Sequence, residues 1–243
     1  MRRALTFALS LVPLLPSVGR AQQPSLRFRV HPWRDGAVVA AGLSAALVPM
    51  LWPNTFAHAT CAPCDPAALW SVDRSTVGPL RAAAGAFSTG TLGLEAVLGT
   101  LFLASSRRGE GTAALAEDAT IIAQAVTVTA AVTEWAKILI HRPRPFLYMQ
   151  TATGPVAADD GQSMPSSHTS VAFAAAAAYA SVLHRRGLAG HDKLQIGVLF
   201  AAAATTGILR VVAHEHFPTD VVAGAALGFA IGWTIPALHS TLP

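Results

Sequence analysis

Six long apolar stretches, separated by polar connections, constrain the fold of this chain more than any other feature. They cover residues 37–52, 80–104, 119–140, 169–183, 194–213 and 221–238. Several reach the roughly 20 residues that a helix needs to cross the apolar core of a bilayer, and only the first and the fourth are short. None shows the alternation that is typical of a β-strand. The sequence therefore predicts an all-α, multi-pass transmembrane bundle of five to six helices.

The composition agrees with a membrane protein. Charged residues make up 12% of the chain and hydrophobic residues 52%, whereas soluble domains carry roughly 25% charged residues. Alanine and glycine are dense in the apolar stretches, as in 172–178 and 224–228, and small residues let helices pack closely in membranes. The marginal lengths leave open a soluble protein with Ala-rich buried helices. The net charge of +4 does not predict nucleic-acid binding, because the basic residues are dispersed and few aromatic residues lie among them.

The N-terminal region divides into two parts. Residues 1–21 carry arginines, then an apolar run, then Gly19-Arg20-Ala21, which is typical of a secretory signal peptide or an uncleaved N-terminal anchor. Residues 22–79 are expected to form an N-terminal helix and an extracytoplasmic loop that contains Cys61 and Cys64. Two thiols cannot complete a tetrahedral zinc site alone, and we expect a local disulfide between them in an oxidising compartment. Residues 80–238 are expected to form the core that contains the candidate catalytic residues.

Basic residues in the connections predict the orientation. Arg107 and Arg108 lie in one connection, and Arg185, Arg186 and Lys193 lie around the next but one. These connections fall on the same side of the bundle, which the positive-inside rule assigns to the cytoplasm. A cleaved leader would place residue 22 outside, and six crossings would then bring the polar clusters described below inside. Either the stretch 37–52 does not cross, or the leader stays inside and all six stretches cross; both alternatives keep those clusters outside.

The first polar cluster contains Lys137 and Arg144. Lys137 lies near the end of an apolar stretch, and Pro143 is expected to end that helix, because proline lacks an amide hydrogen and disfavours helix in the residue before it. Arg144 follows directly, so both cations can reach the same mouth of the bundle. Taken alone, this cluster also fits ordinary snorkelling of long basic side chains at a helix end.

The second polar cluster is Pro165-Ser166-Ser167-His168, at the start of the next apolar stretch. Ser166 is a favoured N-cap residue, which puts Ser167 and His168 in the first turn. Free amide hydrogens at a helix N-terminus bind anions. A phosphate there would meet the Ser166 hydroxyl and the amides of Ser167 and His168. A capped helix with a surface histidine is the alternative interpretation of this cluster.

The third polar cluster runs from Arg210 to Asp220. Pro218 suits the first position of a helix, which places His216 just before that helix and Asp220 in its first turn. Asp220 could accept a hydrogen bond from one nitrogen of His216 and leave the other nitrogen free as a nucleophile. A metal site around His214-Glu215-His216 is disfavoured, because these residues lack the i, i+4 spacing of helical zinc ligands.

Together the three clusters resemble the three signature motifs of the type 2 phosphatidic acid phosphatase superfamily, which also includes bacterial class A acid phosphatases and vanadium haloperoxidases. The resemblance covers roughly residues 80 to 238, and the joint spacing makes it specific. The chain departs from the motifs at two positions. The family usually has glycine where this chain has Ser167, whose amide remains, and serine where it has Leu209, which removes a hydroxyl.

The resemblance implies a role for each site residue. His216 would attack phosphorus, oriented by Asp220, and His168 would protonate the leaving oxygen. The equatorial oxygens would be neutralised by the phosphate-binding set Lys137, Arg144, Ser166, Ser167 and Arg210. No metal and no cofactor are implied.

These observations predict a metal-independent phosphatase in the inner membrane of a bacterium, with the active site facing the periplasm. The expected partners are the membrane and a phosphorylated lipid of the polyprenyl diphosphate, phosphatidic acid or phosphatidylglycerol phosphate class. Alternatives are a secreted soluble acid phosphatase, a vanadate-dependent haloperoxidase, and a non-catalytic protein that binds lipid phosphate. The sequence leaves the substrate and the oligomeric state open.

Overall fold

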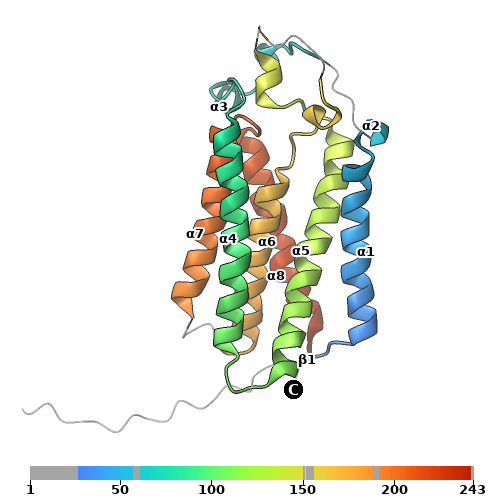
Figure 1. The fold of residues 1–243 in the computed structure, drawn as a ribbon, viewed down its shortest axis with the longest axis vertical. Coiled ribbons are helices and arrows are strands. Elements are labelled where there is room, and N and C mark those ends of the chain that lie inside the picture. The colour runs from blue at the N-terminus through green and yellow to red at the C-terminus, as the bar shows by residue number, and fades with distance from the viewer. Residues whose placement is uncertain (1–26, 57–60, 150, 152–155, 189–191, 242–243) are drawn as a thin grey trace, which may run out of the picture.

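In the part of the chain that the structure describes, six long helices form a bundle, run along a common axis and alternate in direction (Figure 1). The computed structural model describes residues 27–56, 61–149, 151, 156–188 and 192–241. Its long helices are α1 (Pro32–Leu51), α4 (Ala82–Ser106), α5 (Thr112–Ile140), α6 (Ser167–Arg185), α7 (Lys193–Val212) and α8 (Pro218–His239). The all-α bundle predicted from the apolar stretches is thus confirmed.

Short elements close the two ends of the bundle. The upper end in Figure 1 carries α2 (Pro53–Phe56), η1 (Pro66–Ala68), α3 (Ser71–Arg74), η2 (Pro145–Tyr148) and η3 (Ala158–Gly161). At the lower end the two-residue strands β1 (Arg27–Phe28) and β2 (Ser240–Thr241) pair antiparallel. The predicted leader, residues 1–21, lies outside the described residues.

Helix α1 belongs to the bundle and runs alongside α5. The Trp135 indole nitrogen donates to the Ala45 carbonyl at 3.0 Å, and the Gln124 amide donates to the Asp35 carbonyl at 3.2 Å. These contacts lie near opposite ends of α1, so the helix follows α5 over its length. By length and composition, α1 could cross a membrane with the other helices.

The outer faces of the helices are apolar. Leu139, Phe87 and Val222 are 83%, 71% and 67% exposed, and such side chains on every outer helix would be costly in water but are suited to lipid. Five helices, α1, α4, α5, α7 and α8, are long and apolar enough to cross a membrane. The sixth, α6, lies at the centre, where its small side chains are buried against α4, α5, α7 and α8.

Glycines on α8 let this helix approach α6 closely. A Cβ atom added at Gly228 would lie 2.0 Å from the carbonyl oxygen of Ser170. Gly224 and Gly232, one turn before and one turn after, make the same approach, with added Cβ atoms 2.7 and 2.4 Å from α6 carbonyl oxygens. Spacing by four residues keeps the glycines on one face of the helix. This contact fixes the start of α8 against the start of α6, where two of the three polar clusters lie.

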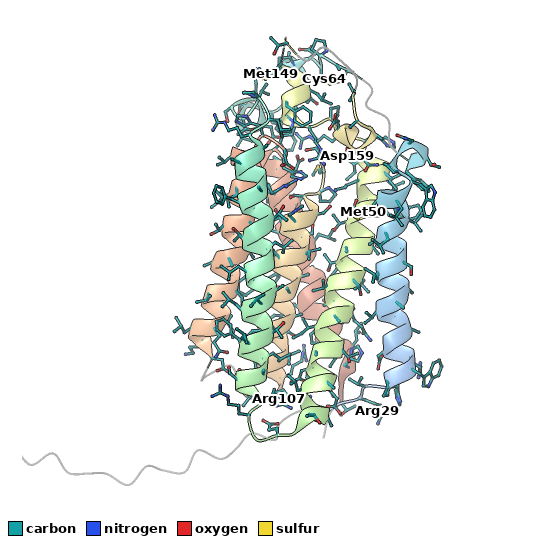
Figure 2. All side chains as sticks on the ribbon, in the orientation of Figure 1. Arg29, Met50, Cys64, Arg107, Met149 and Asp159 are labelled. Carbon is teal, nitrogen blue, oxygen red and sulfur yellow. A yellow bond between two sulfur atoms is a disulfide. The ribbon has the colours of Figure 1, made fainter. Side chains whose placement is uncertain are left out.

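The two ends of the bundle differ in chemistry. Figure 2 shows Cys64, Met149 and Asp159 at the upper end, and Arg29 and Arg107 at the lower end. At the upper end Cys61 and Cys64 form a disulfide. At the lower end, Arg107 and Arg108 follow α4, and Arg185 and Arg186 lie at the end of α6.

Candidate active site

The three polar clusters meet at the upper end of the bundle around a cavity of about 520 Å³. Most of the predicted site residues line it: Lys137, Arg144, Ser167, His168, Arg210 and His216. Ser166 and Asp220 are fully buried and do not line the cavity. Segments from α5, the connection after it, α6 and the α7–α8 connection thus converge on one pocket.

His216 presents one imidazole nitrogen to this cavity. Its Nδ1 atom bonds to the backbone carbonyl of Ser163 at 2.6 Å, and its Nε2 atom lies 3.5 Å from a guanidinium nitrogen of Arg210. A carbonyl can only accept, so Nδ1 carries the proton and Nε2 keeps its lone pair. Nε2 is therefore available as a nucleophile.

The charge state of His216 is set by its surroundings. Burial lowers the pKa of His216 well below 6.5, and the nearby charges of Arg144, Arg210 and Lys137 lower this pKa further; the bond to the Ser163 carbonyl acts in the opposite direction. An imidazole with a lowered pKa stays neutral, which is the form that a nucleophile requires.

Asp220 is placed differently from the expectation. Its carboxylate lies 3.9 Å from Nδ1 of His216, too far for a hydrogen bond. It accepts instead from the Ser163 hydroxyl at 2.5 Å and from the Phe217 amide at 2.8 Å. The expected Asp220–His216 hydrogen bond is replaced because the backbone carbonyl of Ser163 already takes the Nδ1 proton. Ser163 links the two residues by hydrogen bonds, because its hydroxyl donates to Asp220 and its carbonyl accepts from His216.

The cations of the cavity are held by carboxylates. The Lys137 ammonium lies 3.2 Å from a carboxylate oxygen of Glu134, one helical turn earlier on α5. Arg144 and Arg210 both contact the same oxygen of Glu215, Arg144 at 3.5 Å. These carboxylates hold the three positive groups around the cavity. An anionic ligand that binds there could take the place of the carboxylates.

The start of α6 behaves as an anion site. Ser166 is the N-cap residue, and its amide donates to the carbonyl of Asp220 at 3.1 Å. The amides of Ser167 and His168, the first two helical residues, make no backbone hydrogen bond within the part of the chain that the structure describes. Ser166 does not present its hydroxyl to the cavity as expected; this oxygen accepts from Thr169 at 3.0 Å. The first-turn amides of two cavity-lining residues are thus left without backbone partners, whereas the Ser166 hydroxyl is used within the helix start.

The second histidine, His168, reaches the cavity from the first turn of α6. Its Nε2 atom lies 3.2 Å from the hydroxyl of Thr89 on α4. The hydroxyl of Ser167, the departure from the family motif, donates to Glu134, which also lines the cavity, at 2.5 Å. The extra side chain thus finds a partner on α5 and leaves the amide of the same residue free.

The described residues were also compared with the requirements of a metal site. Within the described ranges, no three or more histidine, cysteine, aspartate or glutamate side chains are grouped to hold a metal ion. His214 points out of the cavity and bonds to the carbonyl of Pro79 at 2.7 Å, so His214-Glu215-His216 does not converge on one point.

A comparison with protein families supplies an independent finding. The model of the PAP2 superfamily matches residues 118–242, a little more than half of the chain. The chain belongs to the PAP2 superfamily. The matched segment contains all three polar clusters, so the resemblance stated from the motifs is confirmed.

The chain is similar to the crystal structure of the first transmembrane PAP2 type phosphatidylglycerolphosphate phosphatase from Bacillus subtilis, with 19% identity and a TM-score of 0.47, over 85% of this chain and 96% of that chain. A comparison with curated protein sequences finds no match. PAP2 membership supports a phosphatase, and the apolar helices support a multi-pass membrane protein.

Several residues around this PAP2 site were missed from the sequence. Arg142 was assigned to none of the three polar clusters, although its guanidinium contacts Asp220 at 2.6 Å and Asp73 at 2.7 Å. Ser163 acts through its backbone carbonyl, for which no side-chain pattern exists. The pairing of Glu134 with Lys137 had a signal in the i, i+3 spacing.

Proposed function

We propose that this protein is a metal-independent phosphatase that removes phosphate from a phosphorylated lipid through a phosphohistidine on His216. The observation that carries the proposal is the unprotonated Nε2 atom of His216, which lies 3.5 Å from a guanidinium nitrogen of Arg210 in a cavity that also contains Lys137 and Arg144. A neutral nucleophile beside three cations fits in-line attack on a phosphoryl group.

In the first step, Nε2 of His216 forms a bond to phosphorus while the bond from phosphorus to the leaving oxygen breaks. His168 gives a proton to that oxygen, and the leaving group departs as an alcohol or, from a lipid diphosphate, as the lipid monophosphate. Lys137, Arg144 and Arg210 neutralise the equatorial oxygens, and the amides of Ser167 and His168 donate to them. These groups are already in place, so little reorganisation is needed as charge develops.

In the second step, water attacks the phosphohistidine. His168, now neutral, accepts a proton from this water, the bond from nitrogen to phosphorus breaks, and inorganic phosphate leaves. His216 returns to its neutral form with the proton still on Nδ1, bonded to the Ser163 carbonyl. The proposed role of Asp220 is to hold Ser163 through its hydroxyl.

A lipid substrate is supported by the apolar side of the cavity. Pro49, Met50 and Pro53, at the end of α1 and the start of α2, line the cavity together with the cations. Met50 is 60% exposed, and it lies on the outer side of the bundle near the upper end (Figure 2). A phosphate in the cavity could therefore have its apolar tail beside α1, in contact with the membrane.

The proposed orientation places this cavity at the extracytoplasmic surface. Arg107 and Arg108 after α4 and Arg186 after α6 lie at the opposite end of the bundle, where Arg107 and Arg186 both pair with Asp118, and basic connections mark the cytoplasmic side. With six crossings, Pro32 at the start of α1 is then cytoplasmic. In a bacterium the cavity would open to the periplasm.

Phosphate release by purified protein in detergent tests the proposal. The substrates are a polyprenyl diphosphate, phosphatidic acid, phosphatidylglycerol phosphate and p-nitrophenyl phosphate, each with EDTA present. The variants are His216→Ala and, as a matched control, His31→Ala, whose exposed side chain lies at the other end of the bundle. We expect release from lipid substrates that EDTA does not reduce, that His216→Ala abolishes and that His31→Ala leaves intact.

Other outcomes would contradict specific parts of the proposal. Release that requires a divalent ion, or that survives in His216→Ala, would contradict the phosphohistidine mechanism. Preference for p-nitrophenyl phosphate over every lipid would contradict the lipid substrate. Phosphate binding without release would favour a binding protein, and peroxidase activity with vanadate would favour a haloperoxidase.

A further inference from the structure

We infer that Asp73 is a positioning residue for His216, acting through Arg142, Asp220 and Ser163; this inference rests on the proposed function. Asp73 lies on α3, outside the segment that matches the PAP2 model. Its side chain is only 1% exposed, although it comes from a short element at the end of the bundle.

Both oxygens of the Asp73 carboxylate are used. One oxygen accepts from the Arg142 guanidinium at 2.7 Å and from the Thr219 hydroxyl at 2.7 Å. The other accepts from the Thr219 amide at 3.2 Å. A buried carboxylate is stable only when it is paired and hydrogen-bonded in this way. Asp73 is thus bonded both to the start of α8 and to the connection after α5.

Arg142 connects Asp73 to Asp220, because its guanidinium bonds to both carboxylates. Its Nη1 atom donates to Asp220 at 2.6 Å and to the Thr219 hydroxyl at 2.7 Å, while Nη2 points to Asp73. The guanidinium also lies over the ring of Phe217, 4.4 Å from its centroid. With Asp73 on one side and Asp220 on the other, the planar group has one orientation.

Ser163 connects this network to the nucleophile. Its amide donates to the Arg142 carbonyl at 2.7 Å and its hydroxyl to Asp220 at 2.5 Å. Its carbonyl accepts the Nδ1 proton of His216 at 2.6 Å. Arg142 and Asp220 therefore hold the peptide that selects the tautomer and ring orientation of His216.

The segment that presents Asp73, residues 61–77, is itself fixed to the bundle. The Arg74 side chain donates to the carbonyls of Pro66, Ala67 and Leu69. The Cys64 amide donates to the Leu147 carbonyl at 2.8 Å. These contacts fold the segment into a cap over the site and hold Asp73 against Arg142. None of the carboxylate's contacts reaches the phosphate-binding cations, so its effect should fall on the chemical step and not on phosphate binding.

The test is a kinetic comparison of Asp73→Asn with Asp65→Asn. Asp65 lies on the same cap and is exposed, and its side chain accepts from the amide of Ala67, so it controls for loss of a carboxylate from this segment. We expect kcat for lipid phosphate release to fall at least tenfold in Asp73→Asn, while KM and the inhibition constant of vanadate change less than twofold. Asp65→Asn should match wild type in all three.

A double-mutant cycle tests the route. If Asp73 acts through Arg142, then Asp73→Asn should have little further effect on kcat in an Arg142→Gln background. Fully additive losses, an unchanged kcat in Asp73→Asn, or a loss that appears in KM and vanadate inhibition alone would each overturn the inference.

A milder variant covers the case in which Asp73→Asn does not fold. Thr219→Val removes the hydroxyl between Asp73 and Arg142 and keeps the charges and the shape. It should lower kcat severalfold without changing vanadate inhibition, and an unchanged kcat would count against the network. An inactive wild type, or an active His216→Ala, would instead contradict the proposed function itself.

Discussion

The imidazole of His216 donates from Nδ1 to the backbone carbonyl of Ser163 at 2.6 Å, while the carboxylate of Asp220 lies 3.9 Å from the same nitrogen. A main-chain group therefore selects the tautomer of the proposed nucleophile. Substitutions of Asp220 and of His216 should therefore differ in their effects on activity, because Asp220 makes no hydrogen bond to the imidazole.

We expect Asp220→Asn to retain measurable activity where His216→Ala retains none. The Ser163 carbonyl remains in the Asp220→Asn variant, so the tautomer of His216 is kept. The hydrogen bond from the Ser163 hydroxyl to residue 220 becomes weaker, so Ser163 is held less firmly. A loss of roughly 10- to 100-fold in kcat, about 1.4 to 2.7 kcal/mol in the barrier, is the expected scale. Steady-state phosphate release measures it. Equal loss in the two variants would mean that Asp220 holds the imidazole directly in the working enzyme.

The lowered pKa of His216 predicts acid sensitivity of the fold. The folded state holds a neutral imidazole, whereas the unfolded chain binds a proton near pH 6.5. This contribution to stability is complete above pH 6.5 and is lost as the pH falls toward the lowered folded pKa. One such group changes the free energy of unfolding by up to about 1.4 kcal/mol per pH unit.

His216→Asn provides the measurement for this effect. Its amide can still donate to the Ser163 carbonyl but does not titrate. Thermal unfolding in detergent should depend less steeply on pH below 6.5 in the variant than in wild type. The same slope in both proteins would show that His216 does not titrate differently in the folded and unfolded states.

Glu215 is expected to compete with phosphate. Its carboxylate contacts both Arg144 and Arg210 in the cavity, so an incoming phosphate has to displace it. We expect Glu215→Gln to bind inorganic phosphate and vanadate more tightly, by about threefold or more, since a neutral amide pairs more weakly with guanidinium groups than a carboxylate does. The inhibition constants measure this.

A matched control for that experiment is Glu117→Gln. Glu117 pairs with Arg186 at 3.1 Å at the opposite end of the bundle, and its loss should leave both inhibition constants unchanged. Weaker inhibition in Glu215→Gln would mean that Glu215 is needed to hold the two arginines in place, and that competition is not its main effect.

The contact between α6 and α8 should not tolerate a larger residue at Gly228. An added Cβ atom would lie 2.0 Å from the Ser170 carbonyl oxygen, so the helices must separate. We expect Gly228→Ala to lose about 1 to 3 kcal/mol of stability, which is typical of overpacking. Gly197→Ala on α7, where nothing lies within 4 Å of an added Cβ, should be neutral or stabilising. Thermal unfolding of both variants checks this, and equal stability would contradict the close approach.

Much of the fold was predictable because helices in a membrane need long apolar stretches. The predicted stretch 194–213 became α7, Lys193–Val212, and 80–104 became α4, Ala82–Ser106. The beginning of α5 was missed by seven residues, since 119 was predicted and Thr112 was found. Asp118 lies in this first part of α5 and hides it from a search for apolar runs. In the structure Asp118 is buried and paired with Arg107 and Arg186.

The sequence by itself determined which residues could form the site. The spacing of Lys137, Arg144, His168, Arg210 and His216 placed each of them at the same end of a helical bundle, because alternate helix ends lie on one side of a membrane. Helix direction and length follow from local sequence, so they can be predicted from a single sequence. The PAP2 motifs are readable for the same reason.

Only the tertiary structure decided how these residues are held. Asp73 and Thr219 are 146 positions apart, and Asp73 and Arg142 are 69 apart, so no local pattern connects them. The acceptor for His216 is a backbone carbonyl, a group that every residue possesses and that packing alone brings into place. The sequence thus identifies the chemical groups that can form the site, and long-range packing determines which of these groups are in contact.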